Sequence, residues 1–236
     1  LADGKAWHEL DDARIASVIK TSLDQHITHT PTLVVLDRIF RDDYDAQFNE
    51  PVAQLMPLWY RDFWHRPDLG YTAQESAMLH EWGSPLPKMK LMVRRMHEAG
   101  VPLHVGTDTI NAFVVPGAAM HEEMHNFQDC GFTPEQVWVA ATRDNGASLP
   151  LKDLGVLKDG APADFLIFKE DPTGDLSKLD TLEAVVANGR LYPRADLDAA
   201  LARYRDRYAR RSVQWVMMTL MRFFAPHPEA KPAKHE

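Results

Sequence analysis

Cysteine is nearly absent from this sequence of 236 residues, which contains Cys130 alone. A single cysteine cannot form a disulfide within the chain, and it cannot build a zinc site from several thiolates. A lone cysteine is most often a small core residue, so we expect that role for Cys130 rather than a nucleophile. Cysteine usage leaves the redox compartment open.

Long hydrophobic runs and an excess of positive charge are also missing. No stretch reaches the roughly 18 apolar residues of a membrane-spanning helix, and the first residues lack a signal-peptide pattern. Acidic residues outnumber basic ones, 34 to 26, which gives a formal net charge of -8. This balance argues against nucleic acid as the main partner, because phosphate binding needs clustered Lys and Arg. We expect a soluble protein, and both cytoplasm and periplasm fit the sequence.

The first half of the chain indicates an α/β layout. A hydrophobic content of 45% is enough for a sizeable core in one domain or one and a half. Apolar residues at helical spacing predict a helix over 11–25, and the β-branched, apolar run 28–36 predicts a buried strand. Residues 37–87 are rich in aromatics and proline, which is typical of a functional loop or one with short helices of its own.

The second half of the sequence predicts helices and a strand up to residue 147, followed by short strands from residue 154. Residues 88–100 predict a helix with Gly100 as its stop, and 101–109 a short buried strand that ends in Gly-Thr-Asp. Further elements are expected as helices over 118–131 and 133–147, short strands within 154–160, 163–168 and 183–192, a helical Arg-rich tail from 195, and disorder over 226–236.

Asp108 is the main candidate for chemistry, because it stands at the C-terminal end of a predicted strand. In an α/β barrel this edge carries the active site. A carboxylate there costs free energy unless a metal, an arginine or hydrogen bonds satisfy it. The residues alone leave two interpretations open: a metal ligand that also accepts a proton from metal-bound water, or a cap of the following turn.

The sequence from Gly100 to Leu191 resembles the C-terminal signature of the amidohydrolase superfamily, closest to its imidazolonepropionase-like and Xaa-Pro dipeptidase-like branch. AGVPLHVGTDT resembles the eighth barrel strand with its metal-binding aspartate. PGAAMHEEMHNFQDCGFTPEQVWVAAT resembles the family's helical His-x-Glu-Leu and Ala-Ala-Thr segment, and Asn145-Gly146-Ala147 stands where the family has Asn-Pro-Ala. LKDLGVLKDGAPADFLIF resembles the stretch that ends in Ala-Asp-Leu. Upstream, THTPTLVVLD resembles the seventh strand, so the resemblance covers roughly residues 10–192.

The resemblance implies the C-terminal part of a (β/α)8 TIM-like barrel over residues 1–150, part of a small β-sandwich over 151–193, and an Arg-rich helix with a disordered tail over 194–236. It also implies one or two divalent metals, most simply zinc. The ligands would be a His-x-His pair, a carboxylated lysine or a glutamate, two further histidines and the strand-eight aspartate. Only the last maps here, to Asp108, and we expect the others before Leu1.

The implied function is a metal-dependent hydrolase of amide or peptide bonds. Asp108 would hold a metal and act as general base and then acid. A dipeptide, an N-acyl amino acid and a cyclic amide are all compatible substrates, since one fold hosts many functions. The alternative is a non-catalytic or incomplete fragment that needs a complementary N-terminal chain.

Local histidines do not replace the missing ligands in this interpretation. His26 and His29 are three apart, and on a strand they would point to opposite faces. His104 is expected to pack within the barrel. His121 and His125 share a helix face, where a structural or supporting role is expected.

The segment 51–67 would lie over the barrel mouth after strand seven. Tyr60 and its aromatic neighbours could wall a substrate pocket, and Arg61 or Arg66 could pair with a substrate carboxylate. The alternative is a small local core under a long loop.

The tail 201–225 holds six arginines against one acid and an apolar stripe at helical spacing. We expect this helix to pack on the barrel or on a second subunit of a homo-oligomer. A basic amphipathic helix on a membrane surface is the weaker alternative.

Overall fold

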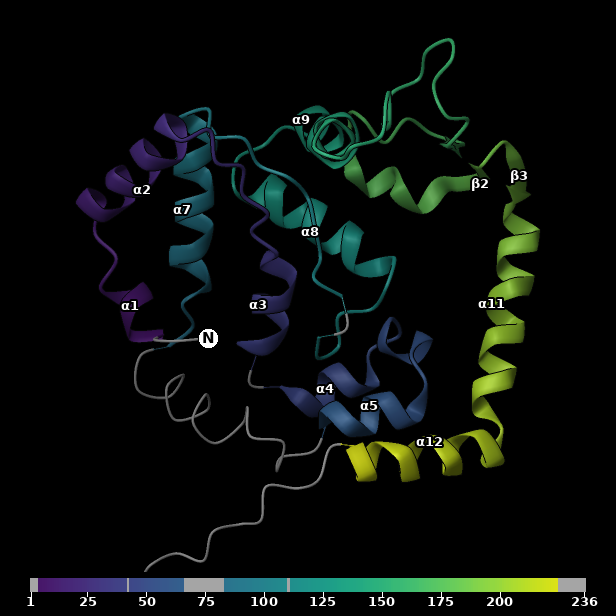
Figure 1. Cartoon of the computed structure of the whole chain (residues 1–236). Helices are drawn as coiled ribbons and strands as arrows, with labels where there is room; N and C mark the ends of the chain where they lie inside the picture. Colours follow the sequence, from purple (N-terminus) through teal and green to yellow (C-terminus); the bar gives the residue numbers. More distant parts are fainter. Residues whose placement is uncertain (1–3, 42, 66–82, 110, 225–236) are drawn as a thin grey trace, which may run out of the picture.

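The computed structural model describes residues 4–41, 43–65, 83–109 and 111–224, and combines many helices with one small sheet (Figure 1). In the first half lie α1 (Gly4–His8), α2 (Asp12–Asp24), α3 (Leu33–Ile39), α4 (Tyr44–Asn49), η1 (Ala53–Leu55), α5 (Leu58–His65) and α7 (Leu86–Glu98). In the second half lie α8 (Ala118–Asp129), α9 (Pro134–Val139), the π-helical turn η2 (Ala140–Asp144), α10 (Asn145–Ala147), β1 (Phe165–Phe168), η3 (Leu176–Thr181), β2 (Leu182–Ala187), β3 (Arg190–Pro193), α11 (Arg194–Ala209) and α12 (Arg211–Phe224).

The helices with strong amphipathic patterns form where the sequence predicts them. The four apolar stripe residues of α7 are all buried: Met89, Met92, Val93 and Met96. Gly100 follows this helix with a φ of 78°, a left-handed conformation that glycine adopts without strain. In α9, the Thr133 side chain accepts a hydrogen bond from the backbone N–H of Gln136, and the Gln136 side chain accepts one from the backbone N–H of Thr133, which completes a capping box.

The predicted strand over 28–36 is wrong beyond its first residues, because the chain turns into α3 at Leu33. Only His29 makes a β contact, an isolated parallel bridge to Leu103. A short apolar run fits a buried helix as well as a buried strand. The Glu123 carboxylate decides the outcome here, since it accepts hydrogen bonds from the backbone N–H groups of Leu33 and Val34.

The segment 101–109 is extended before Asp108, and it lies beside His29. Its backbone exchanges two hydrogen bonds with His29, which donates to the Pro102 carbonyl at 3.1 Å and accepts from the His104 N–H at 2.9 Å. Val101, Leu103 and Val105 are buried at alternate positions, as in a strand with one covered face.

A second correction concerns residues 154–160, which form no strand. Asp153 and Gly155 have φ values of 58° and 78°, which break an extended backbone, and Leu157 is 78% exposed. The sheet of the described residues is a meander in the order β1-β2-β3, with both pairs antiparallel. The turn at Asn188 and Gly189 has positive φ at both residues, as a tight hairpin requires.

Short helices occupy the described parts of the segment 37–87, as the sequence allowed. Helix α11 leads from β3 along one side of the molecule to α12, which lies against α5 (Figure 1). Cys130 is fully buried, and burial raises the pKa of its thiol to about 11, which confirms its core role. The predicted disorder of 226–236 falls outside the described residues.

Within the portion of the chain that the structure describes, no helix combines the length and apolar character needed to cross a membrane.

Candidate metal-ligand site

Asp108 lies on the surface at the end of the extended segment 101–109. The Asn111 side chain donates from its Nδ2 to the Asp108 carbonyl at 2.8 Å and to the Asp108 carboxylate Oδ2 at 3.2 Å. No hydrogen bond from the described residues reaches Oδ1. The carboxylate also accepts no backbone N–H from them, so it does not cap the following turn in the usual way. One carboxylate oxygen is therefore free to take a cation or a proton.

Backbone strain gathers around the ends of the two neighbouring segments. Thr32, Asp108 and Phe113 have φ values of 50°, 44° and 55°, in the left-handed region that non-glycine residues rarely adopt. For a β-branched residue such as Thr32 this is an outlier. Each strained residue costs on the order of 1–3 kcal/mol, and such residues cluster at functional sites.

Close packing and one side chain hold the end of the Asp108 segment. A Cβ at Gly106 would lie 2.5 Å from Cγ2 of Thr30, so only glycine lets the two segments come this close. On the other side, Asn145 donates from its Nδ2 to the Val105 carbonyl at 2.7 Å. Asn145 follows the π-helical turn η2, and such turns often occur at functional sites. These contacts position the residues just before Asp108.

Glu123 fixes the neighbouring segment from a fully buried position on α8. Its carboxylate accepts the Leu33 N–H at 2.9 Å and the Val34 N–H at 2.6 Å. Burial raises the pKa of Glu123 to about 7, although both hydrogen bonds oppose the rise. Interpretation of the sequence missed Glu123 as a functional residue. The sequence indicated this residue only through the motif His121-x-Glu123, which resembles the His-x-Glu motif of the family.

The local histidines are scattered rather than gathered at Asp108. His29 is partly buried, with its Nε2 at 2.8 Å from the Ser22 hydroxyl. His26 and His125 are exposed. Burial lowers the pKa of the half-buried His121 on α8, which favours its neutral form.

Two of the predicted pocket residues, Tyr60 and Arg61, lie on α5 and make different contacts. Tyr60 and Trp64 lie on one face with their rings 6.2 Å apart, and burial raises the pKa of Tyr60. They pack in one apolar cluster with Ala112 and Phe113, which follow Asp108 closely in the chain. This face of α5 therefore covers the loop that follows the candidate ligand.

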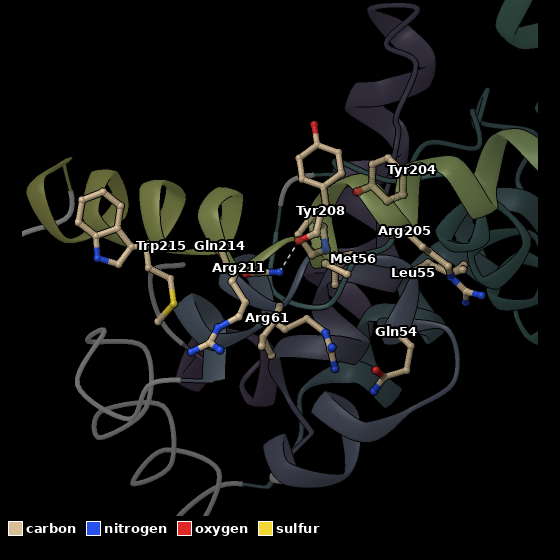
Figure 2. Close-up of a pocket in the computed structure, with 14 residues that line it drawn as sticks. Gln54, Leu55, Met56, Arg61, Tyr204, Arg205, Tyr208, Arg211, Gln214 and Trp215 are labelled. Atoms are coloured by element: carbon tan, nitrogen blue, oxygen red, sulfur yellow. Dashed lines mark hydrogen bonds between the residues drawn. The ribbon is translucent and has the colours of Figure 1, made fainter.

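Arg61, the next residue of α5, is only 8% exposed. Its Nη1 donates to the Phe48 carbonyl at 3.0 Å, and its guanidinium carbon stands 4.7 Å from the centre of the Phe48 ring. It also lines a cavity that α11 and α12 close (Figure 2). Arg66 falls outside the described residues. A substrate-binding role for Tyr60, Arg61 or Arg66 stays a prediction.

The described residues fit a metal as one ligand and not as a complete set. They contain no group of three His, Cys, Asp or Glu side chains that could hold an ion. Catalytic zinc sites take three protein ligands and keep a further position open. Asp108, with its free oxygen, fits one of these places, and the other ligands must come from elsewhere.

Comparisons with known proteins bear on the family and the fold of the chain. The model of the amidohydrolase family matches residues 13–192. A bottromycin amidohydrolase has a TM-score of 0.62 and 22% identity, covering 87% of this chain and 47% of that one. A Xaa-Pro dipeptidase with methionine in its active site has a TM-score of 0.55 and 18% identity, covering 79% of this chain and 38% of that one. For the ochratoxinase of A. niger the values are 0.50 and 20%, covering 75% and 34%.

At these identities the solved structures show a shared fold, and this chain spans less than half of each. No curated protein matches the chain. The family match extends over most of the sequence, from the start of α2 to β3. The chain belongs to the amidohydrolase family.

Proposed function

We propose that this chain supplies the strand-eight aspartate, Asp108, to the metal centre of a hydrolase that cleaves an amide or peptide bond. The single observation that carries the proposal is the Asp108 carboxylate, with one free oxygen, at the end of a segment that pairs in parallel with its neighbour. The carboxyl ends of parallel barrel strands form the active-site face in such folds. In this proposal 28–32 and 101–108 are adjacent barrel strands.

The proposed metal is one or two divalent ions, most simply zinc, held by Asp108 together with ligands outside the described residues. When bound, such an ion polarises the carbonyl of the substrate and lowers the pKa of water toward about 7. Asp108 would hold the ion through its carboxylate. The same carboxylate accepts the proton of the attacking water, holds it, and returns it to the leaving nitrogen. Asn111 orients the carboxylate through its Oδ2.

The proposed substrates are a dipeptide, an N-acyl amino acid or a cyclic amide. Support comes from the family and from the names of two similar structures, a Xaa-Pro dipeptidase and a bottromycin amidohydrolase. Tyr60 fits this role through its place beside the loop after Asp108, where an aromatic wall would exclude water from the reacting bond. Arg66 is kept as a candidate for a substrate carboxylate.

A second candidate function has its own observation. Because the described residues offer Asp108 and no three-ligand group, the chain could act only after a complementary chain supplies the rest. In that case the 26.8 kDa chain alone is an incomplete, non-catalytic part. The two candidates predict different polypeptides in the active material.

The test combines intact mass under denaturing conditions, zinc content and hydrolysis of a panel of Xaa-Pro dipeptides, N-acyl amino acids and cyclic amides. We expect activity and zinc only in material that holds a longer polypeptide or a second chain beside the residues studied. The substitution Asp108→Asn should lower kcat/KM by roughly 10²–10⁴-fold and release zinc. The exposed Asp159, changed to Asn, is the matched control and should leave both unchanged.

Each outcome decides between the candidates. Full activity in Asp108→Asn would refute the role of this carboxylate. Active, zinc-loaded material that contains only the 26.8 kDa chain would refute the need for ligands from a longer polypeptide or a second chain. A pure chain of that mass without zinc or activity, restored by a complementary chain, would establish the second candidate.

A further inference from the structure

A cavity of about 660 Å³ lies where η1 and α5 meet α11 and α12 (Figure 2). This volume falls within the range of small-molecule sites, roughly 300–1,000 Å³. Gln214 secures the corner between the two C-terminal helices. Its Nε2 donates to the Tyr208 carbonyl at 2.5 Å, and its Oε1 accepts the Trp59 N–H at 3.1 Å. The cavity is therefore held by hydrogen bonds that link distant parts of the chain.

The walls of the cavity are largely apolar. Leu55 and Met56 come from η1 and the residue after it, and Met218 comes from α12. Tyr204 and Trp215 add aromatic surface, and the large, apolar side chain of Trp215 is 70% exposed. An exposed tryptophan beside an apolar hollow suits a ligand with an apolar body.

The charged groups of the lining are all positive. Arg61, Arg205 and Arg211 line the cavity, and no aspartate or glutamate does. Neither Arg205 nor Arg211 forms an ion pair with a carboxylate of the described residues. In a chain with a formal net charge of -8, three guanidinium groups around one hollow form a local excess of positive charge. Such a lining favours an anion by charge complementarity.

Arg61 is the strongest part of this argument, because it is 8% exposed and poorly satisfied. Its one hydrogen bond from Nη1 goes to the neutral carbonyl of Phe48, and its buried Nε has no partner. Burial lowers the pKa of Arg61, and the charge of Asp62 offsets only part of this effect. A buried cation without a paired carboxylate is costly. An anion in the cavity would supply the missing partner.

We propose that this cavity binds an amphipathic carboxylate, with an acyl or aryl body on the apolar wall and its carboxylate at Arg61, attracted also by the charges of Arg205 and Arg211 on either side (Figure 2). Guanidinium groups match the planar carboxylate geometry with two parallel hydrogen bonds. The site uses residues that the proposed hydrolysis does not require. The carboxylate partner that the sequence suggests for Arg61 thus belongs to the cavity with α11 and α12.

The test is calorimetric titration of the full chain with dodecanoate below its micelle concentration. We expect saturable binding of one molecule per chain, and at least 10-fold weaker binding in Arg205→Gln/Arg211→Gln. Both arginines are exposed, so the folded structure should persist. The matched control, Arg203→Gln/Arg207→Gln, removes the same charge from α11 outside the cavity and should change the Kd less than twofold.

The proposal would be overturned by no saturable binding, by an equal loss in both double variants, or by equally tight binding of neutral dodecanol. Binding to vesicles of anionic lipid without binding of monomeric dodecanoate would also overturn it, in favour of a membrane contact through α12. None of these measurements depends on hydrolysis, so they separate the cavity from the proposed metal centre.

Discussion

The buried carboxyl of Glu123 should make the stability of this protein depend on pH near neutrality. Burial raises its pKa from 4.5 to about 7. The folded state therefore keeps a proton between these values, while the unfolded state has already released it. By linkage, the stabilisation is complete below pH 4.5 and is lost as the pH rises through 7. The group gives no further pH dependence above that range.

The magnitude follows from the size of the pKa change. One pKa unit corresponds to about 1.4 kcal/mol, so the rise from 4.5 to about 7 corresponds to about 3 kcal/mol. The substitution Glu123→Gln removes the titration. It keeps an oxygen for one of the two N–H groups of α3 but turns an NH₂ group toward the other. At pH 5 the variant should therefore be less stable than the wild type by about 1–3 kcal/mol.

The assay is urea unfolding of both proteins at several values between pH 5 and pH 8. Relative to Glu123→Gln, the wild type should lose about 2.5 kcal/mol of unfolding free energy across this range. Burial lowers the pKa of His97 and His121, which gives the opposite slope. Both proteins share that slope, and it cancels in the difference. Exposed Glu183, changed to Gln, is the control. A wild-type to variant difference that is the same at pH 5 and pH 8 would refute the reasoning.

Three further substitutions test packing and pairing through the free energy of unfolding in urea. Gly146→Ala should lower the free energy of unfolding by about 2 kcal/mol, because its methyl group would clash with the backbone carbonyl of Leu154. Its control, Gly174→Ala, places the methyl group in open space and should be neutral. Arg38→Met should lose about 3 kcal/mol, because it leaves Glu122 of α8 without its arginine and Glu50 with Arg41 alone, and adding Glu122→Gln should recover part of the loss. Asn145→Leu should lose about 2 kcal/mol by leaving a buried carbonyl unpaired. Losses below 0.5 kcal/mol would contradict each of these assignments.

The elements that could be predicted are those whose information is local. The apolar stripe of α7 and the cap of α9 lie within their own residues, and the structure forms both. The strand pattern and the family resemblance predicted Asp108 at the end of an extended segment, and the structure places it there. Local pattern was therefore enough for these helices and for the position of the candidate ligand.

The elements that could not be predicted depend on contacts across long stretches of sequence. Helix α3 begins at Leu33 because Glu123, 90 residues away, satisfies its first N–H groups. The segment 154–160 has strand-like composition, but a strand needs a partner, and the positive φ of Gly155 prevents a continuous ladder. The approach of Gly155 to the Thr142 carbonyl is equally invisible in the local pattern.

Contacts from three elements surround the backbone and carboxylate of Asp108. Thr30 from the neighbouring segment, Asn145 from α10 and Asn111 from the next turn all act within a few residues of this carboxylate. None of the three contacts takes up its Oδ1. Contacts from Thr30, Asn145 and Asn111 thus leave one carboxylate oxygen without a hydrogen bond from the described residues, and the proposed ligand role requires such an oxygen. A surface aspartate with only a turn to cap would need none of these supports.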